Sequence, residues 1–275
     1  MGESFRQVLA RVGFSVFVAL AAAFFALPML WLVFAPFDPT PTLAARPAGP
    51  TLANFRDVFQ NPLVLTSLRN SLLLALYAMV LVVAAATLAA YALSRVRLPG
   101  RDLLLYVLLL FSSVVSGTAA MVPLFLLVFE LGLINTYLGV TLVLTGGLLP
   151  AAIFILKDFT DTTPTSYEES ARVFGASPFQ ILKDVVVPLV RPGMAVIAVW
   201  TLVNVWGNFL IPFILLRDPN LAPASVVTYS FYTEGGQADL RLLSAFSLLY
   251  SVPVVVMYLF VQRRYGFRFY GGIKR

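Results

Sequence analysis

The sequence predicts an all-α integral membrane protein with six transmembrane helices, and three observations lead to this fold class. Of the 275 residues, 60% are hydrophobic and 12% are charged, which is about half the charged fraction of soluble domains. The uncharged stretches are long enough to cross about 30 Å of hydrocarbon as helices of roughly 20 residues. A backbone in lipid must satisfy its own hydrogen bonds, so the spanning segments are expected to be helices.

The expected spans belong to one membrane domain that covers residues 1–275, without tandem repeats. The first span, Phe14–Ala35, has an apolar run longer than that of a signal peptide, which favours an uncleaved helix over a removed leader. The remaining spans follow from uninterrupted apolar composition, and they are Asn70–Leu93, Leu103–Phe129, Leu138–Leu156, Gly193–Leu216 and Leu242–Val261.

The distribution of basic residues predicts the orientation. If the N-terminus is cytoplasmic, fourteen of the 19 Lys and Arg residues face the cytoplasm, and only five face outside: Arg46, Arg56, Arg69, Arg217 and Arg241. This asymmetry agrees with the positive-inside rule and places both termini in the cytoplasm. The net charge of +6 reflects this orientation signal, helped by anionic lipid, so no nucleic-acid partner is needed to explain it.

Composition also limits the chemistry. The chain has no cysteine and no histidine, which removes disulfides, thiolate metal sites and the commonest metal ligand. The six spans contain no charged residue, whereas proton-coupled carriers depend on ionisable groups inside the membrane. Sodium coupling through carbonyls of broken helices stays open. We expect no catalytic and no metal-binding residues, and a membrane enzyme is disfavoured for that reason.

The loop expected between the fourth and fifth spans, residues 157–192, is polar and carries helix signals. Ser166-Tyr-Glu-Glu169 predicts a capping box at the start of a helix over Tyr167–Phe174. Gly175 is expected to end this helix in a left-handed conformation. Ser177 and Pro178 then predict the start of a second helix, which Pro188 would stop or kink.

The short helix is expected to have two faces. Tyr167, Ala171 and Phe174 recur at i, i+4 and i+7 and form an apolar stripe. The other face carries the charged residues Glu168, Glu169 and Arg172. Two turns of helix are unstable alone in water, so the protein itself, a partner, or both must support it. Two plainer interpretations stay open, namely that Glu169 only caps the helix and that the stripe packs on neighbouring membrane helices.

The spacing in this loop resembles the EAA motif of ABC-importer permeases. The chain reads Glu169-Ser-Ala, three residues, Gly175, nine residues and Val185-Val-Val-Pro188. The family pattern is Glu-Ala-Ala, three residues, Gly, nine residues and Ile-x-Leu-Pro, so the departures are Ser170, Val185 and Val187. Five further segments resemble the carbohydrate-uptake branch, of the maltose-transporter type: Asn70-Ser-Leu72, Tyr91–Arg101, Leu131–Tyr137, Leu216–Pro219 and Gly271–Arg275.

The resemblance implies a type I ABC importer fold in a multi-pass protein of the bacterial cytoplasmic (inner) membrane. In that family a second permease subunit completes the pathway, an ATPase dimer binds on the cytoplasmic side, and an extracytoplasmic sugar-binding protein delivers the solute. ATP and Mg belong to the ATPase, so this chain would bind no cofactor. By similarity Glu169 would meet a basic residue of the ATPase, and the C-terminal tail would reach between the ATPase subunits. The implied ATPase-coupling residues are Tyr167, Glu168, Glu169, Ala171, Arg172, Phe174 and Gly175.

The fifth span contains the residues expected along the solute pathway, Asn204, Trp206 and Asn208. Asn204 and Asn208 are spaced i, i+4 and are expected to share a face. Aromatic rings stack on sugars and amides bond hydroxyls, although packing between helices is an alternative role. The family branch often has Trp-Asn-Glu/Asp where this chain has Trp206-Gly-Asn208, and Ile-Pro where it has Val115-Ser-Gly-Thr118. A non-sugar solute such as a polyol phosphate therefore stays open, as does, more remotely, a self-powered secondary carrier.

Overall fold

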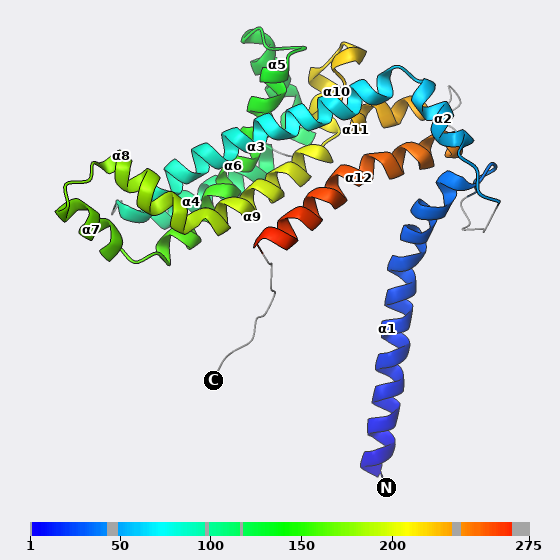
Figure 1. The fold of residues 1–275 in the computed structure, drawn as a ribbon, viewed down its shortest axis with the longest axis horizontal. Coiled ribbons are helices and arrows are strands. Elements are labelled where there is room, and N and C mark those ends of the chain that lie inside the picture. Colours follow the sequence, from blue (N-terminus) through cyan, green and yellow to red (C-terminus); the bar gives the residue numbers. More distant parts are fainter. Residues whose placement is uncertain (1, 43–48, 97–98, 116–117, 233–237, 266–275) are drawn as a thin grey trace. The chain divides into compact units, whose positions relative to one another are not determined.

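The computed structural model describes residues 2–42, 49–96, 99–115, 118–232 and 238–265, and this part of the chain is built from helices and connecting loops (Figure 1). The α-helices are α1 (Gly2–Phe34), α2 (Ala53–Gln60), α3 (Leu63–Arg95), α4 (Arg101–Val115), α5 (Met121–Glu130), α6 (Tyr137–Asp161), α7 (Ser166–Val173), α8 (Pro178–Gln180), α9 (Val187–Trp206), α10 (Leu210–Leu215), α11 (Ala224–Val227) and α12 (Leu240–Tyr265). A π-helical turn, Ile181–Val186, joins α8 to α9. Short 3-10 turns lie at Ala35–Phe37, Thr118–Ala120, Pro219–Leu221 and Thr228–Phe231.

The chain divides into two compact units, each of which is described by itself. The first unit contains Met1–Val64 and Thr228–Val252. In it, the side-chain amide of Asn54 donates to the carbonyls of Pro36 at 3.0 Å and Asp38 at 2.8 Å, which ties α2 to the segment after α1. None of the residues from Ala10 to Phe34 of α1 is buried within the chain, as expected of a helix that faces lipid or another subunit.

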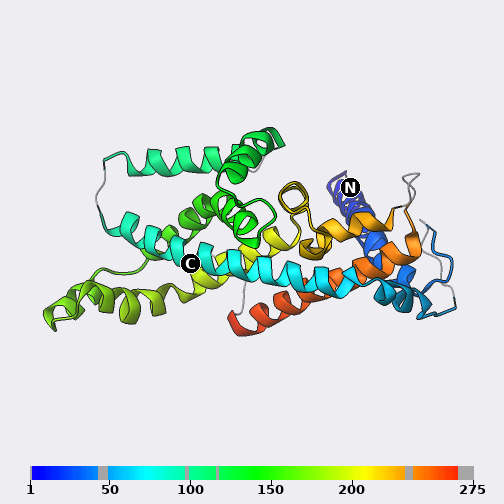
Figure 2. The ribbon, with the colours of Figure 1, turned by 90° about the horizontal axis from the view of Figure 1, so that it is seen from above.

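The second unit, Leu65–Val227 with Pro253–Arg275, has a core between α3, α4, α6 and α9. Figures 1 and 2 both show α3, α6 and α9 running alongside one another in this unit. On α3 the buried residues recur every fourth position, which is the spacing of one helix face. The core residues are Val82, Ala86, Ala90, Leu105, Ala152, Ile153, Leu156, Ile181, Val186, Val190 and Ile197.

Gly193 permits a close approach of α9 to α6. A β-carbon at this position would lie 2.6 Å from Cγ of Phe159 and 2.9 Å from Cδ1 of Leu156. Both distances are shorter than real contacts, so a larger residue would push the two helices apart. Small residues at helix interfaces have this role in membrane proteins, where backbones approach closely to gain van der Waals contact.

Five helices are long and apolar enough to cross a membrane in the described part of the chain: Ala10–Phe37, Leu63–Arg95, Tyr137–Asp161, Pro178–Trp206 and Leu240–Phe260. The expectation of a continuous third span over Leu103–Phe129 is wrong. There α4 ends at Val115, a 3-10 turn follows at Thr118–Ala120, and α5 begins at Met121. Pro123 in the first turn of α5 is tolerated because the first N–H groups of a helix have no acceptor within it.

The expected fifth span also differs in its bounds. Pro188 does not stop the helix that begins at Pro178, since this helix continues to Trp206. Proline removes the donor to the carbonyl four residues earlier, and the chain responds with the π-helical turn before it, in which the N–H of Val187 bonds the carbonyl of Leu182. The expected run to Leu216 is broken after Trp206, and α10 begins at Leu210.

Candidate functional site

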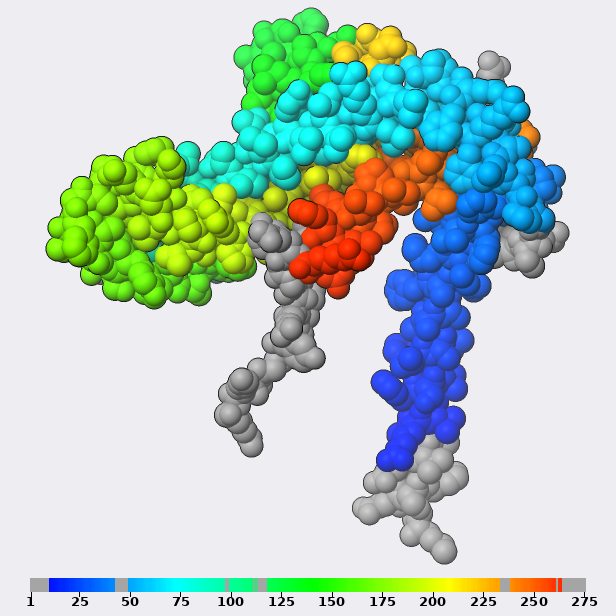
Figure 3. All heavy atoms as spheres, viewed as in Figure 1, coloured from blue at the N-terminus to red at the C-terminus, as the bar shows by residue number. Residues whose placement is uncertain are grey.

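The short helix α7 lies at one end of the second unit. It occupies the connection between α6, which ends at Asp161, and α8, which begins at Pro178. Figures 1 and 2 show α7 and α8 together beyond the ends of α3 and α6, and Figure 3 shows their atoms as a projecting end of the unit. The helices on either side therefore extend into the loop expected over residues 157–192 and shorten its non-helical part.

The start of α7 differs from the capping box expected at Ser166 and Glu169. The helix begins at Ser166, and the preceding residue, Thr165, makes no side-chain capping hydrogen bond. Because Ser166 is already helical, its hydroxyl is not in the position that caps the third N–H. A complete capping box occurs one helix later, where Ser177 and Gln180 bond each other's backbone N–H groups. The expectation that Ser177 caps a second helix with Pro178 in its first turn is confirmed.

Gly175 ends α7 as the sequence predicts. Its φ of +84° is left-handed, which costs glycine little and other residues more. The N–H of Gly175 bonds the carbonyl of Arg172 at 2.9 Å, and the N–H of Ala176 bonds that of Ala171 at 3.0 Å. These two bonds define a Schellman motif, which satisfies the last carbonyls of the helix. Ala176 also packs on the core of the second unit, so the turn holds the chain against the bundle.

The Glu168 cluster, which consists of Tyr91, Arg95 and Glu168, attaches α7 to the end of α3. The side chain of Glu168 is only 2% exposed. Its Oε1 accepts from Nε of Arg95 at 2.6 Å, and its Oε2 accepts from the hydroxyl of Tyr91 at 3.0 Å. Arg95 also donates from Nη2 to the carbonyl of Thr163 at 3.1 Å. Both carboxylate oxygens are therefore satisfied, as a buried charge requires.

A second polar group beside this cluster joins α3 to the end of α6. Asp161 accepts from the hydroxyl of Ser94 and from Nζ of Lys157, both at 2.5 Å. Arg95 donates to the same Ser94 hydroxyl at 3.0 Å, so the two groups are contiguous. The ion pair of Lys157 with Asp161 lies within α6, and the uncharged Ser94 links it to α3.

The burial of Glu168 corrects the expected division of α7 into faces. Glu168 was expected on an exposed charged face with Glu169 and Arg172, but it points into the unit. Ala171 lies beside it, half-buried and packed on the core. Tyr167 and Phe174, which were expected to form one stripe with Ala171, are instead 55% and 89% exposed. The helix therefore packs inward through Glu168 and Ala171, and most of its apolar surface points outward.

The outward surface of α7, here called the docking face, consists of Tyr167, Glu169, Val173 and Phe174. Val173 is 85% exposed, and sequence reasoning did not single it out. Within the described residues, Glu169 makes no side-chain hydrogen bond or ion pair. Arg172 is also exposed and lies 4.0 Å from Glu168. A free carboxylate among exposed aromatic and aliphatic side chains can bind a basic residue of another protein while its neighbours exclude water.

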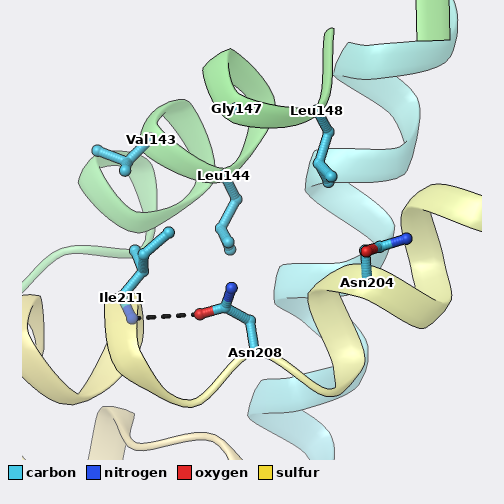
Figure 4. A pocket seen from close by; sticks show the side chains of 7 residues that line it. All are labelled: Val143, Leu144, Gly147, Leu148, Asn204, Asn208 and Ile211. Atoms are coloured by element: carbon cyan, nitrogen blue, oxygen red, sulfur yellow. Dashed lines mark hydrogen bonds between the residues drawn. The ribbon is translucent and has the colours of Figure 1, made fainter. Parts of the chain in front are cut away.

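The residues expected along the solute pathway lie in different surroundings. Asn204 and Asn208 both line a pocket of about 100 Å³ with Val143, Leu144, Gly147, Leu148 and Ile211. Figure 4 shows that Asn208 points toward Leu144, whereas Asn204 turns away from the other lining side chains. The amide of Asn204 donates to the carbonyl of Trp200 at 2.8 Å, and Trp206 is buried within the unit. The pocket thus brings the two asparagines together but not Trp206.

Asn208 has a structural role in this pocket. It lies beyond the end of α9, so it does not continue the helix face of Asn204 as expected. Its Oδ1 accepts from the N–H of Ile211 at 3.2 Å, at the start of α10 (Figure 4). Its carbonyl accepts from the hydroxyl of Ser225 at 2.8 Å. The side chain therefore helps to begin the next helix after the break at Gly207.

At the end of α3 away from α7, three polar side chains hold residues 215–224. The amide of Asn70 donates to the carbonyls of Asn220 at 2.8 Å and Ala222 at 3.1 Å. The hydroxyl of Ser71 accepts from the N–H of Ala224 at 2.8 Å. Asn135 has a positive φ of 61° and bonds Leu215, Arg217 and Asp218. Three of the segments that resemble the carbohydrate-uptake branch therefore lie close together in the structure, namely Asn70–Leu72, Leu131–Tyr137 and Leu216–Pro219. Of the other segments used for that resemblance, Gly271–Arg275 and residues 97–98 of Tyr91–Arg101 lie outside the described residues, as do residues 116–117, where the chain departs from the family pattern.

Comparison with known proteins gives concordant matches. A family model described as "Binding-protein-dependent transport system inner membrane component" matches residues 85–268. The maltodextrin transport system permease protein MdxG of Bacillus subtilis (strain 168) is 33% identical over 215 residues, which are 78% of this chain and 77% of that protein. The osmoprotective compounds uptake permease protein GgtD of Synechocystis sp. (strain ATCC 27184 / PCC 6803 / Kazusa) is 34% identical over 79% of this chain and 72% of its own length.

A solved structure has the same fold. A chain of a bacterial ABC transporter involved in the import of the acidic polysaccharide alginate superposes with a TM-score of 0.79 at 22% identity, over 94% of this chain and 97% of that chain.

Proposed function

Because the chain belongs to the family of binding-protein-dependent transport system inner membrane components, we propose that it forms one half of the pathway of an ATP-driven sugar importer. Membership makes it a multi-pass membrane permease of the ABC type and a transport component, not an enzyme. A second permease subunit would complete the pathway, and an extracytoplasmic binding protein would deliver the solute. ATP and Mg would bind to a separate ATPase dimer. The membrane would be the bacterial cytoplasmic membrane, with both termini inside and with α4 and α5 together forming a sixth crossing beside the five long helices.

The docking face of α7 supports the coupling part of this proposal. It combines exposed Tyr167, Val173 and Phe174 with the carboxylate of Glu169, which has no partner among the described residues, at a projecting end of the second unit (Figure 3). A soluble ATPase would cover this apolar surface and supply a basic residue for Glu169. Closure of the ATPase dimer would then move α7 as a rigid body, which is how packed elements transmit switching. The sequence of 275 residues has no phosphate-binding loop of its own.

Co-purification with the cognate ATPase tests the docking assignment. Glu169→Lys replaces the free carboxylate with a positive charge, and Gly175→Pro removes the left-handed turn and the N–H that bonds Arg172. Both variants are expected to lose most of the bound ATPase and to abolish uptake while still inserting into the membrane. Glu130→Lys makes the same charge change at the exposed end of α5 and is expected to retain the ATPase. Normal recovery of the ATPase with both α7 variants would refute the assignment.

The solute class follows from a different experiment. A carbohydrate is favoured by the similarity to a maltodextrin permease, and an osmoprotective compound is a second candidate because of the 34% identity to GgtD. The solutes retained by the cognate binding protein would decide between them. Solute uptake by the purified chain alone, without ATPase or second permease, would contradict the ATP-driven mechanism and indicate a self-powered carrier.

A further inference from the structure

The unbroken helix α3 bonds α7 at one end and residues 220–224 at the other. At its C-terminal end, Tyr91 and Arg95 are one helical turn apart on the same face and bond the two carboxylate oxygens of Glu168. At its N-terminal end, Asn70 and Ser71 bond backbone groups of the segment that follows α10. All these contacts lie within the second unit.

Both sets of contacts are protected from solvent. Glu168, Asn70 and Ser71 are buried, with exposed fractions of 2%, 3% and 2%. A buried polar group that loses its partner is left unsatisfied, so such contacts resist separation more strongly than exposed ones. Each end of α3 is therefore bonded firmly to the segment beside it and is expected to move with that segment.

The other helices that connect these regions are either interrupted, as in the path through α9, or continuous but with residues that favour bending, as in α6. The path through α9 contains the π-helical turn Ile181–Val186 near α7 and the break at Gly207 before α10. The helix α6 contains Gly146-Gly147 and Pro150. Such positions are where helices bend. By contrast, α3 contains neither glycine nor proline, and the 25 steps from Asn70 to Arg95 span roughly 38 Å at 1.5 Å per residue.

We propose that α3 carries the movement of α7 to residues 216–224, and that Tyr91, Arg95, Asn70 and Ser71 are positioning residues for this connection. The proposal rests on the proposed function for the source of the movement, which is the ATPase bound to α7. It assigns to Glu168 a role distinct from that of its neighbour Glu169. Glu168 would attach α7 to α3, whereas Glu169 would bind the ATPase.

Single-cysteine spin labelling tests the connection, because the chain has no native cysteine. In the assembled transporter a label at Asn220→Cys reports on the far segment, since Asn220 is exposed and Asn70 bonds its backbone carbonyl rather than its side chain. Addition of ATP is expected to change the spectrum of this label. Arg95→Ala and Asn70→Ala are each expected to reduce that change at least threefold while the ATPase still co-purifies.

Asp102→Asn is the matched control. Asp102 is an exposed carboxylate in the first turn of α4, near the same end of α3, and its ion pair is with the adjacent residue Arg101. The control is expected to keep the full ATP response. If Arg95→Ala does not fold, Tyr91→Phe replaces it, because this change removes only one oxygen from the Glu168 cluster. An ATP response in Arg95→Ala or Tyr91→Phe equal to that of the control would overturn the proposal.

A second measurement does not require the ATPase. In the isolated subunit, a spin label at Val173→Cys on α7 is expected to become more mobile when Arg95 is replaced by alanine, and to be unchanged in Asp102→Asn. Equal mobility in all three proteins would overturn the attachment of α7 to α3. If the mobility increases but the unaltered chain retains no ATPase, the proposed function is wrong. In that case the proposed transmission of movement to residues 216–224 is also wrong, and only the role of Arg95 in positioning α7 is supported.

Discussion

The side-chain oxygen of Asn135 accepts hydrogen bonds from the backbone N–H groups of both Arg217 and Asp218, at 2.9 Å each. Asn135 itself is in the left-handed region with φ of 61°, where asparagine is tolerated better than most residues. The N–H of Asn135 donates to the carbonyl of Leu215 at 2.8 Å. One residue thus holds the turn before α6 against the chain that leaves α10.

Three substitutions of Asn135 separate its two contributions. Asn135→Asp keeps an oxygen acceptor and is expected to change the melting temperature least. Asn135→Gly keeps the positive φ but loses both side-chain hydrogen bonds, each of which contributes about 0.5–1.5 kcal/mol. Asn135→Ala loses the same bonds and adds about 1–2 kcal/mol of left-handed strain. Thermal unfolding of the purified protein in detergent measures the order, and an alanine variant as stable as the glycine variant would contradict it.

The contact of Gly193 with Phe159 predicts a strong effect of size. A β-carbon would lie 2.6 Å from the Phe159 ring, so Gly193→Val is expected to destabilise the protein by about 1–3 kcal/mol, as overpacking does. Phe159→Ala in the same chain removes the ring and is expected to restore part of the loss. The measurement is the yield of monodisperse protein together with its melting temperature.

A matched glycine makes the size argument specific. Gly146 in α6 has open space where a β-carbon would lie. Gly146→Ala is therefore expected to be neutral or stabilising by about 0.5–1 kcal/mol, since glycine in a helix interior is unfavourable relative to alanine. Equal destabilisation by Gly146→Ala and Gly193→Val would show that the approach of α9 to α6 is not the cause.

Gly175 predicts a graded series at the end of α7. A β-carbon at Gly175 meets no neighbouring atom, so the cost of a substitution comes from the backbone conformation alone. Gly175→Asn is expected to retain most ATPase binding and uptake because asparagine tolerates left-handed φ. Gly175→Ala is expected to lose more, at about 1–2 kcal/mol of strain. The two variants are compared by solute uptake in the assembled transporter. An alanine variant that is more active than the asparagine variant would contradict the prediction.

Substitution of Asn204 and substitution of Asn208 are predicted to have different effects. Asn208→Ala removes the acceptor for the N–H of Ile211 and is expected to lower stability by about 1 kcal/mol, as loss of a helix-starting side chain does. Asn204→Ala removes an exposed amide whose bond is to its own helix, so stability should change little and only solute uptake should fall. A reversed pattern, with stability lost in Asn204→Ala, would remove Asn204 from the pathway.

Local signals in the sequence correctly identified where α7 ends and where the next helix begins. Gly175 and Ser177 were assigned correctly because a left-handed helix end and a serine cap depend on nearby residues only. The predicted helix Tyr167–Phe174 agrees with α7 to one residue at each end. The capping box expected at Ser166 was wrong because the helix begins at Ser166 itself. No local pattern in the sequence indicates the bonds from Glu168 to residues that are 73 and 77 positions away.

The same limit applies to the spans and to the pathway. Apolar composition predicted membrane helices but could not reveal that the segment from Leu103 to Phe129 is divided between two shorter helices, α4 and α5. Hydropathy is insensitive to a turn of small residues. Asn204 and Asn208 were predicted to share a helix face, and they do line one pocket. They do so although the helix ends between them, because Gly207 redirects the chain and α10 returns toward α6. One feature of the Glu168 cluster was visible in the sequence, because Tyr91 and Arg95 are one turn apart and therefore lie on the same face of a helix.

Successive residues of an α-helix project about 100° apart, so the inward direction of Glu168 sets the azimuth of every other side chain on α7. Glu169 faces outward for this reason, and the two adjacent acids are not interchangeable. If one residue were inserted between Thr163 and Glu168, the ion pair of Glu168 with Arg95 could be kept only if the connection between α6 and α7 changed its conformation. Because Glu168 is the buried one of the two glutamates, it determines which side of α7 faces outward.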